Sequence, residues 1–182
     1  SPVRVRRDVL EEAVQIIRMM WTEYSLTFHG EHYHIENAYC APRPDPIPPL
    51  LIGGAGPKRT LRIVAKYGDW CNLNNAPLDF CVSRLNTLRE HCQDVGRNYD
   101  EIVKTYACDS VAIAPTRAEA ERKLQASYFG KGLSFAGTPD EVAAQIQPYV
   151  DLGITHFILR FVDYPSTASA EMFLKEVMPR FA

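Results

Sequence analysis

The chain has 182 residues, of which 46% are hydrophobic, and its formal net charge is −2. This composition provides for one sizeable core or two small ones, and the near-neutral charge gives no indication of a nucleic-acid partner. No apolar run approaches the roughly 20 residues that span a bilayer, and the first residues lack the apolar core of a signal peptide. We therefore expect a cytoplasmic protein with no membrane partner, and its five cysteines, an odd number, favour reduced thiols.

The first 49 residues predict a helix, a small β element and a proline-rich connector. Leu10, Val14 and Ile17 lie at helical spacing within residues 8–21. Residues 26–35 alternate around a glycine and predict a short hairpin. Its three histidines lack acidic or cysteine partners at ligand spacing beyond two nearby glutamates, so no metal is expected. Five prolines within residues 41–49 exclude a helix and favour an extended connection.

A glycine turn follows this connector and organises the rest of the sequence. Leu50–Ile52 reads as a short apolar strand, and the glycines at 53, 54 and 56 leave backbone N–H groups unobstructed. Pro57 stands where a helix would begin. The first N–H groups of a helix have no intrahelical partner, and the helix dipole adds partial positive charge there. Lys58 and Arg59 add two cations, so the turn predicts a phosphate site.

A second interpretation of the same turn stays open. The glycines would then serve only the geometry of a surface turn, and the two cations would be solvated. The position of the turn directly after a buried strand favours the phosphate site.

The remaining sequence alternates between strands and helices. Gly68 is expected to cap one helix in the left-handed conformation, and a bend is expected near Asp109. Thr116 and Thr138 each precede a glutamate by three residues, a spacing typical of helix starts. The expected strands are 50–52, 69–73, 102–114 and 154–162, and the expected helices are 57–67, 77–95, one from 116, 139–153 and 168–176.

This order predicts four βα units with parallel crossovers. A helix before the first strand and an unpaired sheet edge indicate that further strands preceded the segment, so half of a (β/α)8 barrel, strands five to eight in a single domain 1–182, is the expected fold. Active sites of such barrels lie at the carboxyl ends of the strands. We therefore expect Gly53–Gly56, Asn72–Asn75 and the residues after Phe161 to converge.

Two further features bear on that site. His156, Ile158 and Arg160 share one face of the last strand, which directs Arg160 toward the barrel mouth. Residues 127–137 contain three glycines and several aromatic residues, which fits a mobile cover over a site or, alternatively, a plain connector.

The stretch FHGEHYHIENAYCAPRPDPIPPLLIGGAGPKRTLRIVAKYGDWCNL closely resembles the luciferase-like monooxygenase family, especially its coenzyme F420-dependent oxidoreductase branch. The resemblance continues through LREHCQDVGRNYDEIVKT, GTPDEV and LGITHFILRF, so it covers nearly the whole chain. It implies a TIM barrel with F420 or a flavin across its carboxyl face. It also implies a set of cofactor-binding residues, Ile52, Gly53, Gly54, Ala55, Gly56, Asn72 and Asn74.

The resemblance implies hydride transfer between deazaflavin and a small organic substrate, with no catalytic residue assigned because the family often places such residues in the first strands. An FMN-dependent monooxygenase working with a separate reductase is the first alternative. The second is a non-catalytic half-barrel that binds a phosphorylated ligand or pairs with another chain. Besides a small-molecule substrate, the expected partner is a second copy in a homodimer or the missing half of the barrel.

Overall fold

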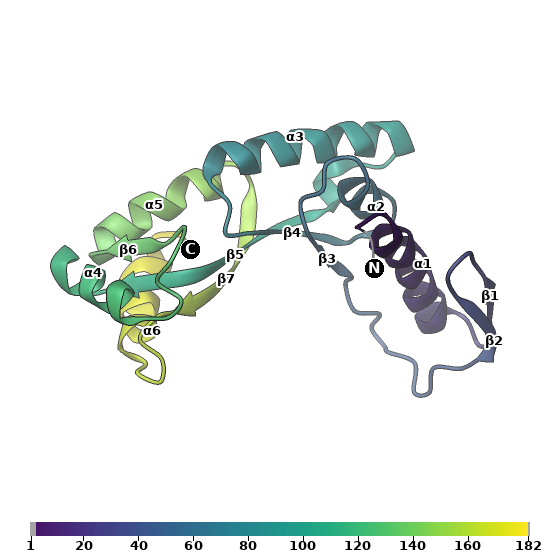
Figure 1. Cartoon of the computed structure of the whole chain (residues 1–182), viewed down its shortest axis with the longest axis horizontal. Coiled ribbons are helices and arrows are strands. Elements are labelled where there is room, and N and C mark those ends of the chain that lie inside the picture. The colour runs from purple at the N-terminus through teal and green to yellow at the C-terminus, as the bar shows by residue number, and fades with distance from the viewer. Residues whose placement is uncertain (1–2, 182) are drawn as a thin grey trace. The chain divides into compact units, whose positions relative to one another are not determined.

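The computed structural model describes residues 3–181, with side chains from residue 9 onward. The chain divides into two compact units. The first comprises Ser1–Trp70 and Thr87–Ile102, and the second comprises Cys71–Asn86 and Val103–Ala182. Figure 1 shows the elements of both units along the chain.

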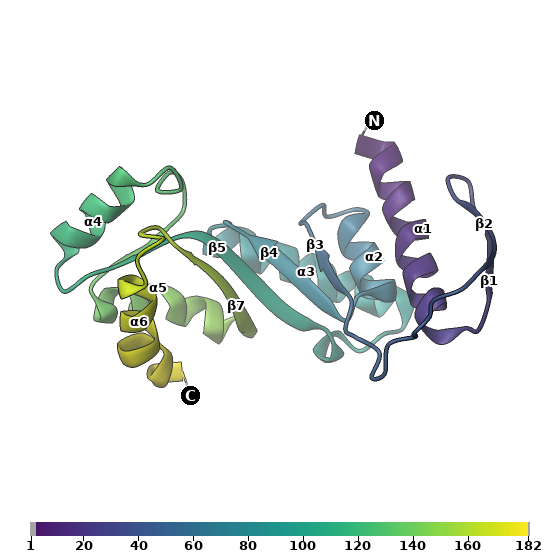
Figure 2. The ribbon, with the colours of Figure 1, turned by 90° about the horizontal axis from the view of Figure 1, so that it is seen from below.

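The first unit begins with the expected amphipathic helix, α1 (Val3–Thr22), which starts earlier than the predicted residue 8. The predicted hairpin is confirmed as strands β1 (Leu26–His29) and β2 (His34–Ala38), which pair antiparallel. The Glu12 carboxylate of α1 accepts hydrogen bonds from the backbone N–H groups of Glu31 at 2.8 Å and Tyr33 at 2.9 Å. The hairpin is therefore anchored to α1, beside which it lies in Figure 2.

The connector before β3 (Leu51–Gly53) contains no helix or strand, as predicted. Helix α2 (Thr60–Tyr67) packs against α1, and Arg18 of α1 contacts Asp69 at 2.7 Å. The same Asp69 carboxylate accepts a hydrogen bond from the Leu50 N–H at 2.7 Å. These contacts fix the start of β3 and the end of α2 within one unit.

The expected left-handed cap at Gly68 is wrong. Its φ is −78° and its ψ is 137°, an extended conformation open to any residue. A Cβ there would lie 3.1 Å from the Val64 carbonyl oxygen and 3.3 Å from the Ile52 side chain. Glycine is favoured here by the close approach of neighbouring atoms rather than by a positive φ.

The second unit is built on parallel strands. Strand β5 (Val103–Ile113) pairs with both β6 (Phe135–Gly137) and β7 (Ile154–Phe161), and β4 (Trp70–Asn74) is its neighbour in the strand order. The sequence did not predict β6, which lies within residues 127–137. The expected bend near Asp109 is confirmed as a register shift between Cys108 and Val111.

Several helices pack against these strands. Helix α4 (Arg117–Ala126) packs on β5 and β6, α5 (Pro139–Asp151) on β6 and β7, and α6 (Ala168–Met172) on β5. The predicted last helix continues as a π-helical turn, Phe173–Val177, and a 3₁₀ turn, Met178–Phe181. Helix α3 (Leu78–Val95) and the 3₁₀ turn Tyr99–Glu101 complete the described elements.

The predicted helix boundaries hold where capping chemistry is present. The Thr116 and Thr138 hydroxyls accept hydrogen bonds from the backbone N–H groups of Glu119 and Glu141. The second of these is a full capping box. Gly96, directly after α3, has a φ of +70°, as expected of a left-handed helix end.

The core of the second unit is aromatic. The fully buried ring of Tyr106 lies 4.7 Å from the Tyr149 ring and 6.0 Å from the Phe135 ring, measured between centroids. Four of the five cysteines are buried, and none of the five forms a disulfide bond within the described residues. No helix in the described part of the chain is long and apolar enough to cross a membrane.

Candidate functional site

The glycine turn of the first unit has the local geometry of a small open cradle. Ile52 is buried at 4% exposure and β3 ends at Gly53. Gly54 has a φ of +117°, which side chains rarely adopt. A Cβ at Gly56 would lie 2.8 Å from the Thr60 hydroxyl oxygen. Ala55 between them is half-buried. Two of the three glycines are therefore required, one by conformation and one by space.

The helix after the turn begins later than predicted. Residues 57–59 form a turn, α2 starts at Thr60, and Arg59 is its N-cap, without a hydrogen bond from the cap side chain. Lys58 and Arg59 therefore precede the first helical turn instead of lying in it. The Pro57 carbonyl lies 2.7 Å from His91 Nε2, a contact that holds this turn against α3.

Thr60 is a candidate residue that the sequence interpretation missed. Its methyl group faces the Cα of Gly54 and its hydroxyl faces that of Gly56, with 3.4 Å and 2.8 Å to the positions that Cβ atoms would take. Thr60 is 8% exposed and lies in the first turn of a helix that no side chain caps, where the Leu61 N–H donates to the Gly56 carbonyl at 3.1 Å. Thr60 follows the glycine turn closely in the sequence, but the predicted helix began at Pro57, so Thr60 was expected inside the helix and not at its start.

In the second unit, one face of the strands is left open. Cys71 and Leu73 of β4 are buried, whereas Asn72 and Asn74 alternate with them on the other face. The Asn72 side-chain oxygen accepts a hydrogen bond from the Thr105 hydroxyl at 2.8 Å. The exposed Asn74 side chain makes no hydrogen bond to the described residues.

The predicted alternation along β7 is confirmed, because His156, Ile158 and Arg160 are exposed and Phe157, Leu159 and Phe161 are half-buried. Residues from β5, from β7 and from directly after β4 meet at one carboxylate. Asp109, at the β5 bend, accepts a hydrogen bond from Asn75 Nδ2 at 2.5 Å, and its N–H donates to Asn75 Oδ1 at 2.8 Å. Arg160 of β7 lies 3.5 Å from the other oxygen of Asp109. Asn75 and Arg160 were singled out from the sequence, whereas Asp109 was expected only to mark a bend.

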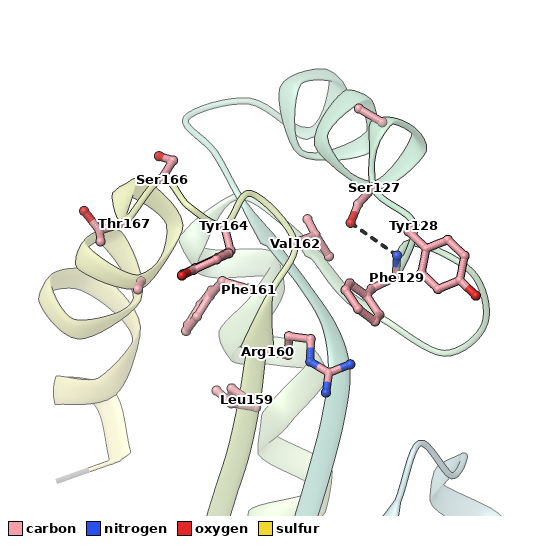
Figure 3. A pocket seen from close by; sticks show the side chains of 12 residues that line it. Ser127, Tyr128, Phe129, Leu159, Arg160, Phe161, Val162, Tyr164, Ser166 and Thr167 are labelled. Atoms are coloured by element: carbon pink, nitrogen blue, oxygen red, sulfur yellow. Dashed lines mark hydrogen bonds between the residues drawn. The ribbon is translucent and has the colours of Figure 1, made fainter.

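A pocket of about 700 Å³ opens at the carboxyl end of β7 (Figure 3). Leu159–Val162 form one wall, residues 126–129 after α4 form a second, and residues 164–170 at the start of α6 form a third. Arg160 is its one cationic residue.

A partly buried polar network supports the third wall. Lys123 of α4 donates hydrogen bonds at 2.9 Å to the Asp163 carboxylate, to the Ser169 hydroxyl and to the Ile113 carbonyl. Burial raises the pKa of Asp163, but Lys123 and Ser169 outweigh it and the net pKa is lowered. Asp163 is therefore a carboxylate that ties the end of β7 to α4 and α6.

Two of the four buried thiols, Cys81 and Cys108, are not candidate nucleophiles. Burial, with a smaller contribution from Asp79, raises the pKa of Cys81 to about 11. Burial likewise raises the pKa of Cys108. Both groups are thiols near neutral pH, and a thiol is a poor nucleophile and metal ligand.

The structure brings together only part of the predicted site. Asn75 and Arg160 meet through Asp109 within the second unit. The residues Ile52 to Gly56 belong to the first unit, whereas Asn72 and Asn74 belong to the second. Convergence of these two groups stays a prediction.

The sequence pattern described as luciferase-like monooxygenase matches residues 2–134. The chain belongs to this family. Among curated relatives, the F420-dependent glucose-6-phosphate dehydrogenase of Kineococcus radiotolerans is 27% identical over 206 residues, covering 97% of this luciferase-like chain and 61% of that protein. The enzyme of the same description from Amycolatopsis mediterranei is 23% identical and covers 94% of the chain and 60% of that protein. The chain thus spans about three fifths of the length of these relatives.

Solved structures of the family show the same fold. An F420-dependent secondary alcohol dehydrogenase, in complex with an F420–acetone adduct, superposes with a TM-score of 0.87 at 21% identity, over all of this chain and 64% of the other. Riboflavin lyase, with modified FMN and riboflavin, gives a TM-score of 0.77 at 17% identity, over 97% of this chain and 57% of the other. The predicted fold class, part of a luciferase-like (β/α)8 barrel, is confirmed.

Proposed function

We propose that the chain belongs to an F420-dependent oxidoreductase and that its glycine turn binds the cofactor phosphate. The observation that carries the phosphate site is the cradle formed by Gly54, Gly56 and Thr60 at the uncapped start of α2. Ile52, Gly53 and Ala55 supply the backbone around it, and Asn72 and Asn74 are proposed cofactor contacts on the open strand face.

The cradle fits a phosphate for three physical reasons. The glycines let the backbone approach closely, the start of a helix offers N–H groups and partial positive charge, and Thr60 adds a hydroxyl donor. Lys58 and Arg59 add positive charge just before the helix. These features suit any phosphate monoester or diester, so they support F420 and FMN alike.

The preference for F420 rests on the relatives. The two curated relatives named above are described as F420-dependent dehydrogenases. F420 would supply hydride transfer to or from a small organic substrate, and this chain would bind the phosphate, orient the ring with amide side chains and exclude water. FMN remains the second candidate because a structural neighbour holds modified FMN.

A side-by-side fluorescence titration with F420 and FMN tests the proposal, performed on the protein that carries this chain with a complete barrel. We expect F420 to bind at least tenfold more tightly than FMN. Thr60→Val keeps the shape of the side chain and removes the hydroxyl, so F420 affinity should fall roughly tenfold, as for loss of a hydrogen bond to a charged group.

Thr22→Val, on the exposed end of α1, is the matched control and should leave both affinities unchanged. Preference for FMN would indicate that the protein is a flavin-dependent member of the family. Binding of neither cofactor would overturn the proposal.

A further inference from the structure

We propose that the pocket at the carboxyl end of β7 binds the oxyanion, a carboxylate or phosphate, of an organic substrate with a flat apolar body. Arg160 is the anion-binding residue. The inference rests on the proposed function in naming this ligand the substrate, since active sites of barrels lie at the carboxyl ends of their strands.

The pocket offers a cation and hydroxyl donors. Among the residues that line it, one is a cation and none is a carboxylate. Ser127 Oγ accepts a hydrogen bond from the Phe129 N–H and Ser166 Oγ accepts one from the Ala168 N–H, each at 3.3 Å. These contacts use an oxygen lone pair, so both hydroxyl protons remain to be donated, whereas the Thr167 hydroxyl donates to Glu171 at 2.6 Å. A site with a cation, two available hydroxyl donors and no carboxylate favours an anion over a cation or an uncharged alcohol.

Arg160 is held in position by contacts on two sides. Its guanidinium lies over the Phe129 ring, 4.4 Å from the centroid, and one Nη lies 3.5 Å from Asp109. Figure 3 shows the guanidinium directed toward the Phe129 ring. Since Asp109 is engaged by a single nitrogen at long distance, the other N–H groups of the guanidinium remain for a bidentate contact with an oxyanion. Half of the Arg160 side chain is exposed, which leaves it accessible.

Phe129 is itself fixed. Its carbonyl accepts a hydrogen bond from the buried Ser110 hydroxyl, and its N–H donates to Ser127. The segment after α4, expected from the sequence to be either a cover or a connector, is therefore tied to β5 at the point where it contacts Arg160.

The apolar residues that line the pocket indicate the shape of the uncharged part of the ligand. The rings of Phe129, Phe161 and Tyr164 line the pocket, with Phe129 beside Arg160 and Phe161 beside Tyr164 (Figure 3). A volume of about 700 Å³ lies in the usual range for pockets of small organic molecules. Flat rings prefer offset-stacked or edge-on partners, so an aryl or similarly flat carboxylate matches both the lining and the donors.

The test compares two probes of similar shape, phenylacetate and the uncharged 2-phenylethanol, by calorimetry on the protein that carries this chain with a complete barrel. We expect phenylacetate to bind roughly tenfold more tightly. Arg160→Met should reduce this preference to about twofold or less while 2-phenylethanol still binds, which shows that the pocket is intact. Arg160→Lys should retain part of the preference. Arg122→Met removes an exposed arginine of α4 and should change neither affinity.

Equal affinities for the two probes, or an Arg160→Met variant that keeps the preference, would overturn the inference. Saturating F420 distinguishes whether the pocket binds the substrate or the cofactor. Phenylacetate affinity that F420 leaves unchanged supports a substrate site, whereas displacement by F420 assigns the anion to the cofactor and overturns it. Failure of F420 to bind while the charge preference persists would refute the proposed cofactor and leave an organic-anion site.

Discussion

At the scale of single residues, Gly54 sets the shape of the glycine turn. Its φ of +117° is one that a β-branched residue adopts only at a cost of about 1–3 kcal/mol. Gly54→Val should therefore weaken F420 binding roughly tenfold or more in the protein with a complete barrel, because the N–H groups of the cradle would be displaced.

Gly153→Val, between α5 and β7, is the control for this change. Gly153 also has a positive φ, +93°, and a Cβ there meets no atom within 4 Å. Affinity for F420 should stay close to that of the unmodified protein. The phosphate assignment would be wrong if Gly54→Val bound F420 as tightly as Gly153→Val while both variants were folded by circular dichroism.

Gly54 and Gly56 could be proposed as site residues from the sequence because their spacing after an apolar strand is visible there. Thr60 could not, since its role depends on where α2 begins, and Pro57 gave a misleading start. Asp109 was also not recognised as a site residue, because its partners Asn75 and Arg160 are 34 and 51 positions away along the chain, and only the fold brings them together.

At the scale of elements, the turn after β4 depends on one buried ring. The Tyr106 hydroxyl of β5 donates to the Ala76 carbonyl at 2.8 Å and accepts from the Ala76 N–H at 3.0 Å. Tyr149 of α5 donates to the same carbonyl at 3.0 Å. Burial raises the pKa of Tyr106, with a smaller contribution from Tyr149, so the hydroxyl stays protonated.

Tyr106→Phe should lower the free energy of unfolding by about 1–3 kcal/mol, the cost of leaving a buried donor without an acceptor. Tyr149→Phe should cost less, because Tyr106 still satisfies the Ala76 carbonyl. Urea unfolding of the two variants beside the unmodified chain measures the difference. Equal losses would show that the Ala76 N–H does not depend on Tyr106.

Capped helices were the most predictable elements. The start of α5 is marked in the sequence by an N-cap threonine, a proline in the first turn and a capping-box glutamate, namely Thr138, Pro139 and Glu141. Strand β6 was the least predictable. It has three residues inside a glycine-rich segment, and it exists because β5 extends beyond its bend and offers Val111–Ile113 for pairing. A partner far away in sequence leaves no local pattern.

At the scale of the whole molecule, the order of four βα units and the family resemblance were sufficient to predict the barrel class. The edge of β7 that faces away from β5 pairs with no described strand, and Ile158 on the open face is 53% exposed. Exposed strand edges are templates for association. The 182-residue chain should therefore self-associate at micromolar concentration, as measured by light scattering after size-exclusion chromatography.

Ile158→Lys should reduce that association, because a charge on an exposed strand disfavours pairing. Leu174→Lys places the same charge on a residue of similar exposure in the π-helical turn, away from the strands, and should have little effect. A monomer at all concentrations would contradict the expectation of a homodimer or of pairing with another half-barrel.

The register of β5 against β7 contains two irregularities that cancel. Between Lys104 and Thr105 the partner advances from Ile154 to His156, so β7 holds one extra residue. Between Cys108 and Val111 the partner advances only from Leu159 to Phe161, so β5 holds the extra residue. Because a slip of one residue exchanges the two faces of a strand, loss of one insertion alone would put the pairs before it out of frame with the pairs after it. Loss of both would keep the two ends of the β5–β7 ladder in frame, so each insertion compensates for the other.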